Sequence, residues 1–443
     1  MAADDRGKTK RRNWKPPVLT WRIGAPPPKR TKAIVKEPEL LPAEQGPPPG
    51  PQTENPSGPE DKEDQQRQLQ QALRAQKVPS PEICEITSSL DPFCQLPYEL
   101  TPENRALLHC YLLQVPAKVY GTRPDTVFSA VRDVSLPMSL GSSLTMWWMI
   151  VAADGLFTHP GADHADTVAR RKGQAYRLLN HSLSQNAGKI TDDLLGGIIM
   201  AAITEARLSD PVACHAHLKG CEAAIEARGG LKKSLMNCEI PGLRLAHLMP
   251  YLVCEPFPAA EGSVEEEQVQ RFVELLISRM NDATEANAVS PQAGLAQLKS
   301  MVVGLGLLRS GLRFYLRPDE RDVTRFADEA ALFLALFLVT RTLWTYRESV
   351  DDSQLFLSRL NAFFEASTGF DPHTGRPLLT EQGLMCCVIK VIQNLPGTPH
   401  SDGGVSTLIH SVDAVQVYRT ITLRSAREEA RLILCRILSG YDF

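Results

Sequence analysis

Paired cysteines are missing from this sequence, although ten cysteines are spread along its 443 residues. No two of them stand in the C-x2-C spacing of a zinc knuckle, so the classical two-His two-Cys finger is excluded. They also lack the tight spacing of a disulfide scaffold. We therefore expect reduced thiols, as in proteins of the cytosol or nucleus.

Long apolar runs are scarce as well. The longest uninterrupted run, Ala330 to Val339, has ten residues, whereas a helix needs about 20 to cross a bilayer. This run predicts a buried helix and no membrane association. The start of the chain has no apolar core typical of a signal peptide, and it is too rich in proline for an amphipathic transit helix. We expect an intracellular protein.

Signatures of catalysis are absent too. The sequence has no nucleophile elbow, P-loop, dinucleotide glycine fingerprint, H-E-x-x-H motif or kinase motif. Gly304-Leu305-Gly306 lies in an apolar, helix-like run without a preceding strand or a third glycine. We expect no enzyme and no cofactor; only a constellation assembled in space would change that expectation.

Charge is distributed very unevenly in the first 66 residues. Residues 1–36 hold eleven Lys or Arg against two Asp, a balance of +9, and residues 37–66 hold eight Asp or Glu against one Lys, a balance of −7. Thirteen of the 33 prolines precede residue 60. This composition predicts a disordered arm over residues 1–63, followed by a polar helix or linker over 64–89.

The basic part of the arm contains two clusters typical of a nuclear import signal, with Lys10, Arg11 and Arg12 in the first and Lys29 and Arg30 in the second. A merely solvated tail is the alternative. The net charge of −3 argues against a protein that coats nucleic acid over its whole surface. The arm itself could contact phosphates weakly and without reading bases.

Beyond residue 90 the pattern is helical, and strand-like alternation is scarce. We expect an all-α domain of stacked antiparallel helices over 90–443, with loops at 255–263 and 369–377. The break near 255 is read as an insertion in one continuous domain, with a domain boundary as the alternative. The first helix starts at Thr101-Pro102-Glu103; others are expected near 145–157, 166–185, 191–208, 211–228, 241–254, 264–284, 292–316, 321–348, 352–367, 380–394, 404–418 and 421–439.

Residues 190–231 form the most informative segment, because they contain two capped helices in succession. Thr191 is an N-cap followed by acidic residues, and Asp210-Pro211 caps and starts the second helix. Gly229 and Gly230 end it, since glycine accepts the left-handed conformation of a helix C-terminus.

The order of these signals resembles the fungal-specific transcription factor regulatory domain. The motif positions are Asp210, His217, Gly220, Arg228, Gly229 and Gly230. Upstream, 107–112 is similar to the family's opening helix and 175–180 to its middle helix, so the resemblance covers roughly residues 100–232. It implies a nuclear protein that modulates transcription through dimer or cofactor contacts and, in some members, binds a small effector.

One departure from the family concerns DNA binding. The six-cysteine binuclear zinc cluster that normally precedes this domain is absent, which puts direct sequence-specific binding in doubt. We expect action through other transcriptional proteins or as a homodimer; a gene model that lacks a first exon is the alternative. Two rival functions are a helical interaction scaffold outside transcription and a small-molecule sensor with a pocket near Trp147 or Trp344.

Three groups of residues are candidates for a metal or redox site. Cys214, His217 and Cys221 share a helical face, but we favour buried core residues over metal ligands. For His159, His164, Asp163 and Asp166 we favour a surface turn over a cation site. For Cys386-Cys387 we favour two buried thiols over a strained disulfide. Trp147 and Trp148 are expected in the core, with one ring partly exposed. No metal is predicted.

Overall fold

A computed structural model of the chain describes residues 100–122, 128–157, 164–185, 189–240, 242–256, 264–281, 291–305, 311–316, 323–368, 378–395 and 404–439. The chain divides into two units, residues 1–78 and 79–443, and every described residue belongs to the second. The expected disordered arm, the linker and the import residues lie outside the described residues. Their boundaries at 63 and 89 stay predictions.

Capping residues define where the first helix starts and ends. Helix α3 (Pro102–Tyr120) begins where the Thr101 hydroxyl accepts the Asn104 amide hydrogen, and it ends at Gly121, whose φ is 59°. A π-helical turn, η2 (Val131–Ser135), and the short α4 (Leu136–Leu140) follow, and neither was predicted. Helices α5 (Ser143–Phe157) and α6 (His164–Gln185) match their predicted positions closely.

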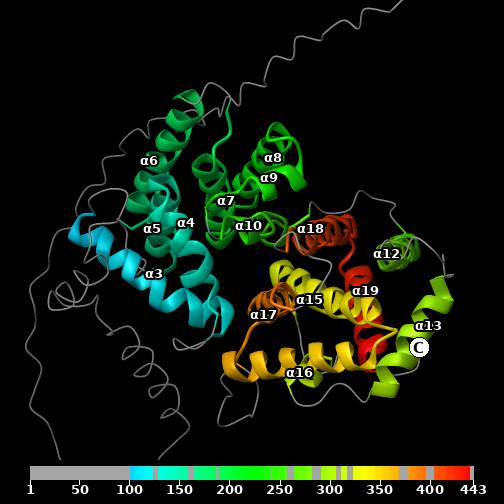
Figure 1. The fold of residues 1–443 in the computed structure, drawn as a ribbon. Helices are drawn as coiled ribbons and strands as arrows, with labels where there is room; N and C mark the ends of the chain where they lie inside the picture. The colour runs from blue at the N-terminus through cyan, green and yellow to red at the C-terminus, as the bar shows by residue number, and fades with distance from the viewer. Residues whose placement is uncertain are drawn as a thin grey trace, which may run out of the picture. The chain divides into compact units, whose positions relative to one another are not determined.

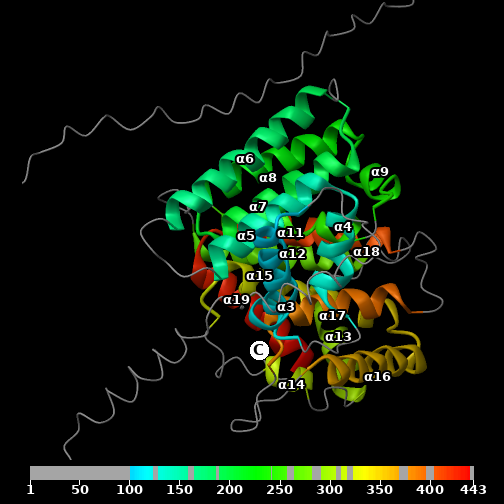
Figure 2. The ribbon, with the colours of Figure 1, turned by 90° about the vertical axis from the view of Figure 1, so that its left-hand side faces the viewer.

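The predicted pair of capped helices is present as α7 (Asp192–Arg207) and α8 (Pro211–Ala227). Thr191 accepts from the Leu194 amide and Asp210 from the Ala213 amide, as expected. Gly229 and Gly230 have φ of 93° and 90°, which confirms the predicted helix end. Figure 2 shows α6, α7 and α8 in the upper part of the described helices, and α7 contacts both of the others.

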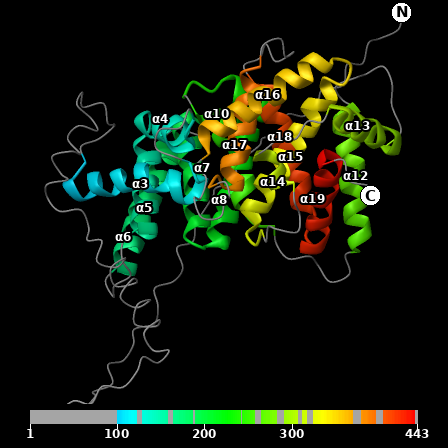
Figure 3. The ribbon, with the colours of Figure 1, turned by 90° about the horizontal axis from the view of Figure 1, so that it is seen from below.

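The rest of the described chain is helical too. Its elements are α9 (Leu231–Met236), α10 (Leu243–Ala246), α11 (Met249–Val253), α12 (Glu265–Asn281), α13 (Pro291–Leu305), α14 (Gly311–Tyr315), α15 (Phe326–Thr345), α16 (Val350–Ser367), α17 (Glu381–Gln393), α18 (Val405–Thr420) and α19 (Arg424–Ser439). Helices α12, α13 and α19 lie together (Figure 3). In the described residues the only β structure is a bridge between Thr122 and Thr368, so the all-α prediction is confirmed (Figure 1).

One predicted boundary was wrong. The single helix expected over 241–254 is two short ones: α10 starts after Gly242, whose φ is 85°, and after a turn α11 starts at Met249 with Pro250 in its first turn. The helix expected over 292–316 corresponds to α13 and α14, with 306–310 outside the described residues.

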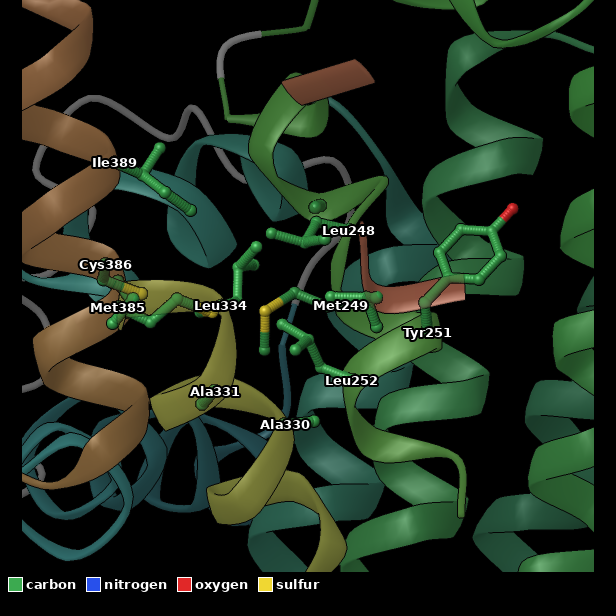
Figure 4. Packing of buried hydrophobic residues seen from close by; sticks show 14 of the residues in the cluster. Leu248, Met249, Tyr251, Leu252, Ala330, Ala331, Leu334, Met385, Cys386 and Ile389 are labelled. Atoms are coloured by element: carbon green, nitrogen blue, oxygen red, sulfur yellow. The ribbon is translucent and has the colours of Figure 1, made fainter. Parts of the chain in front are cut away.

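Helix α15 forms the centre of the core. Residues 330–339 are buried without exception, as the apolar run predicted. Figure 4 shows Leu334 and Ala331 of this helix facing Met249 and Leu252 of α11 and Met385 of α17. Because α11 contacts α7 and α8 as well as α15 and α18, the break near residue 255 does not separate two cores. Among the described residues, no helix is long and apolar enough to span a membrane.

Candidate functional site

The motif residues are spread along α8: Asp210 caps its start, His217 and Gly220 lie within it, and Arg228 follows its last residue. The Arg228 guanidinium lies 2.5 Å from the Asp192 carboxylate, which also accepts the amide hydrogens of Glu239 (2.7 Å) and Ile240 (3.2 Å). Burial opposes ionisation of Asp192, but these amides and Arg228 outweigh it and hold its pKa below the usual value. The Asp192 carboxylate, in the first turn of α7, therefore binds both the motif arginine at the end of α8 and the backbone that follows α9.

Gly220 and His217 lie on the inner side of α8. A Cβ added to Gly220 would meet Ile198 of α7 at 3.8 Å, an ordinary contact, so the packing of the pair at this point does not require glycine. His217 is buried and stacks on Tyr176 of α6, with ring centroids 5.7 Å apart and planes 9° apart. Its Nε2 lies 3.4 Å from the Tyr176 hydroxyl. His217 thus bonds a neighbouring helix, as predicted.

A buried charge lies beside this histidine. Glu205 of α7 is 0% exposed, accepts a hydrogen bond of 2.6 Å from the Tyr176 hydroxyl and forms an ion pair with Lys172. Burial lowers the pKa of His217 to about 4, and the neighbouring Lys172 acts in the same direction. A neutral histidine, a tyrosine and an ion pair therefore hold α6, α7 and α8 together.

This polar cluster was not predicted, yet its signal is present in the sequence. Glu205 follows Ala202 by three residues and Ile198 by seven, so it falls on the apolar stripe of α7. A carboxylate on a buried stripe needs a cation and a donor. Lys172 and Tyr176, four residues apart on α6, provide them. Glu205 is fully enclosed by these partners, and the cluster joins α6 and α7.

The cysteines that were candidates for metal or redox sites are packed in the core. Cys214 and Cys221 are buried, and so are Cys386 and Cys387, whose thiol pKa values burial raises, that of Cys387 to about 12. In the described part of the chain, no three or more His, Cys, Asp or Glu side chains are grouped to hold a metal. His164 lies 3.9 Å from Asp154, whereas His159 and Asp163 lie outside the described residues.

Trp147 and Trp148 are both buried, so the expected partly exposed ring was wrong. The reason is their position on α5, which packs against α3, α6 and α7 and has neighbours on every side. The indole N–H of Trp147 donates to the Arg171 carbonyl.

A small cavity lies between α3, η2, α7, α10, α11 and α17. Its volume is about 20 Å³, and its walls are mostly apolar. Tyr111 and Tyr120 of α3 and Arg207 at the end of α7 bring polar atoms to it. Metabolite pockets usually measure about 300–1,000 Å³. This cavity is of the size of one water molecule, and neither Trp147 nor Trp344, near which the sequence suggested a pocket, lines it.

Comparison with protein-family models, with curated proteins and with solved structures finds no match to this chain. The resemblance to the fungal-specific regulatory domain therefore rests on the order and spacing of residues within about 100–232, and membership of that family stays a prediction.

Proposed function

We propose that the chain is a regulator of transcription that acts through protein contacts of its helical domain, with its basic arm directing it to the nucleus. DNA contact is then indirect, or weak and electrostatic through the arm. The partners are other transcriptional proteins or a second copy of the chain. This proposal includes no enzymatic step.

The observation that supports it best is the helix pair α7 and α8, where the resemblance is strongest. At the start of α8 Asp210 caps the helix, and at its other end Gly229 and Gly230 have left-handed φ and Arg228 pairs with Asp192. These are the cap and helix-end roles that the motif implies. The composition of the arm is the second support, since it is basic where an import signal needs Lys and Arg.

The rival sensor function receives less support. The cavity of about 20 Å³ is too small for a metabolite, and the buried cluster at Glu205 already has its partners within the chain. A scaffold outside transcription remains the main alternative, because helical arrays bind partners in many compartments.

Import separates the two. The test is fluorescence imaging of the tagged full chain and of a variant with Lys10, Arg11, Arg12, Lys29 and Arg30 replaced by alanine. The matched control replaces five acidic residues of the same arm, Glu37, Glu39, Glu44, Glu54 and Glu60, by alanine. We expect nuclear enrichment in the wild type and the control and its loss in the basic variant. A cytoplasmic wild type contradicts the proposal.

Genome-wide chromatin occupancy of the tagged chain tests the transcriptional role. We expect discrete sites at promoters, retained after the basic residues are replaced if an unrelated import signal is fused to the variant. That result assigns the targeting to partners of the helical domain. A nuclear chain with no discrete occupancy overturns the proposal.

A further inference from the structure

The cavity between α3, α7 and η2 combines a positive charge with apolar walls. Met138, Met200 and Met249 line it together with Val134 and Ile203, and Figure 4 shows Met249 in the packed region between α11, α15 and α17. The polar wall residues besides the tyrosines and the arginine are Ser135 and Cys386, and none of the lining residues is acidic.

Arg207, Tyr111 and Tyr120 line this space and are connected by hydrogen bonds. Arg207 donates to the hydroxyl oxygen of Tyr111 at 2.7 Å and to that of Tyr120 at 3.5 Å. Each phenol accepts through its oxygen, so its own hydrogen remains to be donated. Among the residues that the structure describes, nothing accepts it, although Tyr111 is 0% and Tyr120 4% exposed. A buried donor without an acceptor costs about 1–3 kcal/mol.

Arg207, partly exposed in the last turn of α7, brings a positive charge to the cavity wall. The guanidinium of Arg207 stays protonated at any physiological pH, and it lies 5.8 Å from the centre of the Tyr111 ring. In the described part of the chain, no carboxylate forms an ion pair with it; its charge meets only the two tyrosines. Burial raises the pKa of Tyr120 and that of Cys386, so neither becomes the missing anion.

From these three features we propose that the cavity binds a monovalent, monatomic anion of the halide class, chloride under cellular conditions. Arg207 supplies the charge and the hydroxyls of Tyr111 and Tyr120 supply the hydrogen bonds. The volume of about 20 Å³ suits an ion little larger than water and excludes phosphate and larger carboxylates.

The apolar walls favour halide over other small solutes. Methionine and aliphatic side chains offer no acceptor to a cation, and Met sulfur is polarisable. Water would satisfy the hydroxyl donors but would bring no negative charge to Arg207, which is partly buried. Since the site joins the last turns of α3 and α7 to η2, the anion would stabilise the contact of these elements.

The first test measures the ³⁵Cl linewidth in solutions of the purified full chain, together with the melting temperature in sodium chloride and in sodium gluconate of equal ionic strength. We expect excess linewidth that bromide competes away, and a higher melting temperature in chloride. Tyr111→Phe/Tyr120→Phe removes both donating hydroxyls while keeping the rings, and it should weaken chloride binding about tenfold or more. Tyr346→Phe, outside the cavity, is the matched control and should behave as wild type.

Each comparison is made between two salts within one variant, so the effect of chloride can be measured even in a variant of lower stability. If the double variant does not fold, Tyr120→Phe alone replaces it. Equal linewidths and melting temperatures in all salts overturn the proposal and leave a single water in the cavity. Chloride binding that survives in the double variant overturns the assignment to this site. In a crystal soaked in bromide, an anomalous peak beside Arg207 is the expected result.

Discussion

The guanidinium of Arg228, at the C-terminal end of α8, lies 2.5 Å from the carboxylate of Asp192 in the first turn of α7. Both side chains are mostly buried, at 10% and 14% exposed. Since Asp192 also accepts two amide hydrogens from Glu239 and Ile240, three segments of the chain depend on one carboxylate.

Replacing Arg228 by methionine should therefore be costly. It leaves the Asp192 charge buried without its cation, and we expect a loss of about 3 kcal/mol in the free energy of unfolding. Arg132→Met is the control, because Arg132 and Asp133 form an exposed pair, at 47% and 33%, worth at most about 1 kcal/mol. Denaturant titration at pH 7 measures both. Equal losses would mean that the Arg228 pair is no more than a surface contact.

Much of the α7 and α8 pair was predictable because its signals are local. A cap residue, a proline at the first helical position and two glycines each act within a few residues, so Thr191, Asp210 and Gly229 could be assigned from the sequence. The buried helix over 330–339 was predictable from its unbroken apolar run. The partner of Arg228 was not, since 36 positions separate it from Asp192 and nothing local connects them.

The π-helical turn and the short helices from 231 to 253 escaped prediction for a related reason. They are too short to show a period, and their conformation follows from packing against longer helices. The cavity required the fold, because Tyr111, Arg207 and Cys386 come from three distant parts of the chain. Glu205 is different, since its place on an apolar stripe could have revealed it.

The end of α8 should be sensitive to β-branched residues. Gly229 has φ of 93°, and a valine there is strained by about 1–3 kcal/mol. Gly229→Val should lower the melting temperature. Gly173→Ala is the opposite case: this glycine lies within α6, an added Cβ meets nothing within 4 Å, and alanine should stabilise by up to about 1 kcal/mol. A Gly229→Val melting temperature equal to wild type would contradict the left-handed helix end.

The buried ion pair of Glu205 is testable by a double-mutant cycle. Lys172→Met leaves a fully buried carboxylate without its cation and should cost about 3–5 kcal/mol. Adding Glu205→Gln removes the charge, so the double variant should be more stable than Lys172→Met alone. Lys219→Met, on the exposed side of α8, should change stability by no more than about 0.5 kcal/mol. Additive effects of Lys172→Met and Glu205→Gln would disprove the coupling.

Two buried histidines predict loss of stability in mild acid. Burial lowers the pKa of His217 and of His247 to about 4, below the value of about 6.5 expected in the unfolded chain. The unfolded state therefore binds more protons between these values, and stability falls as pH decreases from 6.5, by about 1.4 kcal/mol per pH unit for each histidine. The lowered pKa of Asp192 acts in a separate window, since its contribution is lost only below about pH 4.

Urea titrations at pH 7, 6 and 5 separate His217 from the rest. His217→Phe keeps an aromatic ring stacked on Tyr176. It should reduce the slope of the unfolding free energy against pH by the contribution of one histidine. His181→Phe, at an exposed position, should leave the slope as in the wild type. A slope unchanged in His217→Phe would show that this histidine is already protonated in the folded state.

The close approach of α17 to the end of α3 should make Gly383 irreplaceable. The Tyr120 carbonyl accepts the Thr380 amide hydrogen at 3.2 Å, and a Cβ on Gly383 would lie only 2.2 Å from that carbonyl oxygen. Because the obstacle is backbone, Gly383→Ala must push α17 away and should cost about 1–3 kcal/mol. Gly220→Ala is the matched control, since its Cβ would make ordinary contact and the helix gains from alanine. Tyr120 also lines the anion cavity, so Gly383→Ala should weaken the chloride effect on melting temperature, whereas Gly220→Ala should leave it intact. A Gly383→Ala variant as stable as wild type would show that α3 and α17 are not held at this distance.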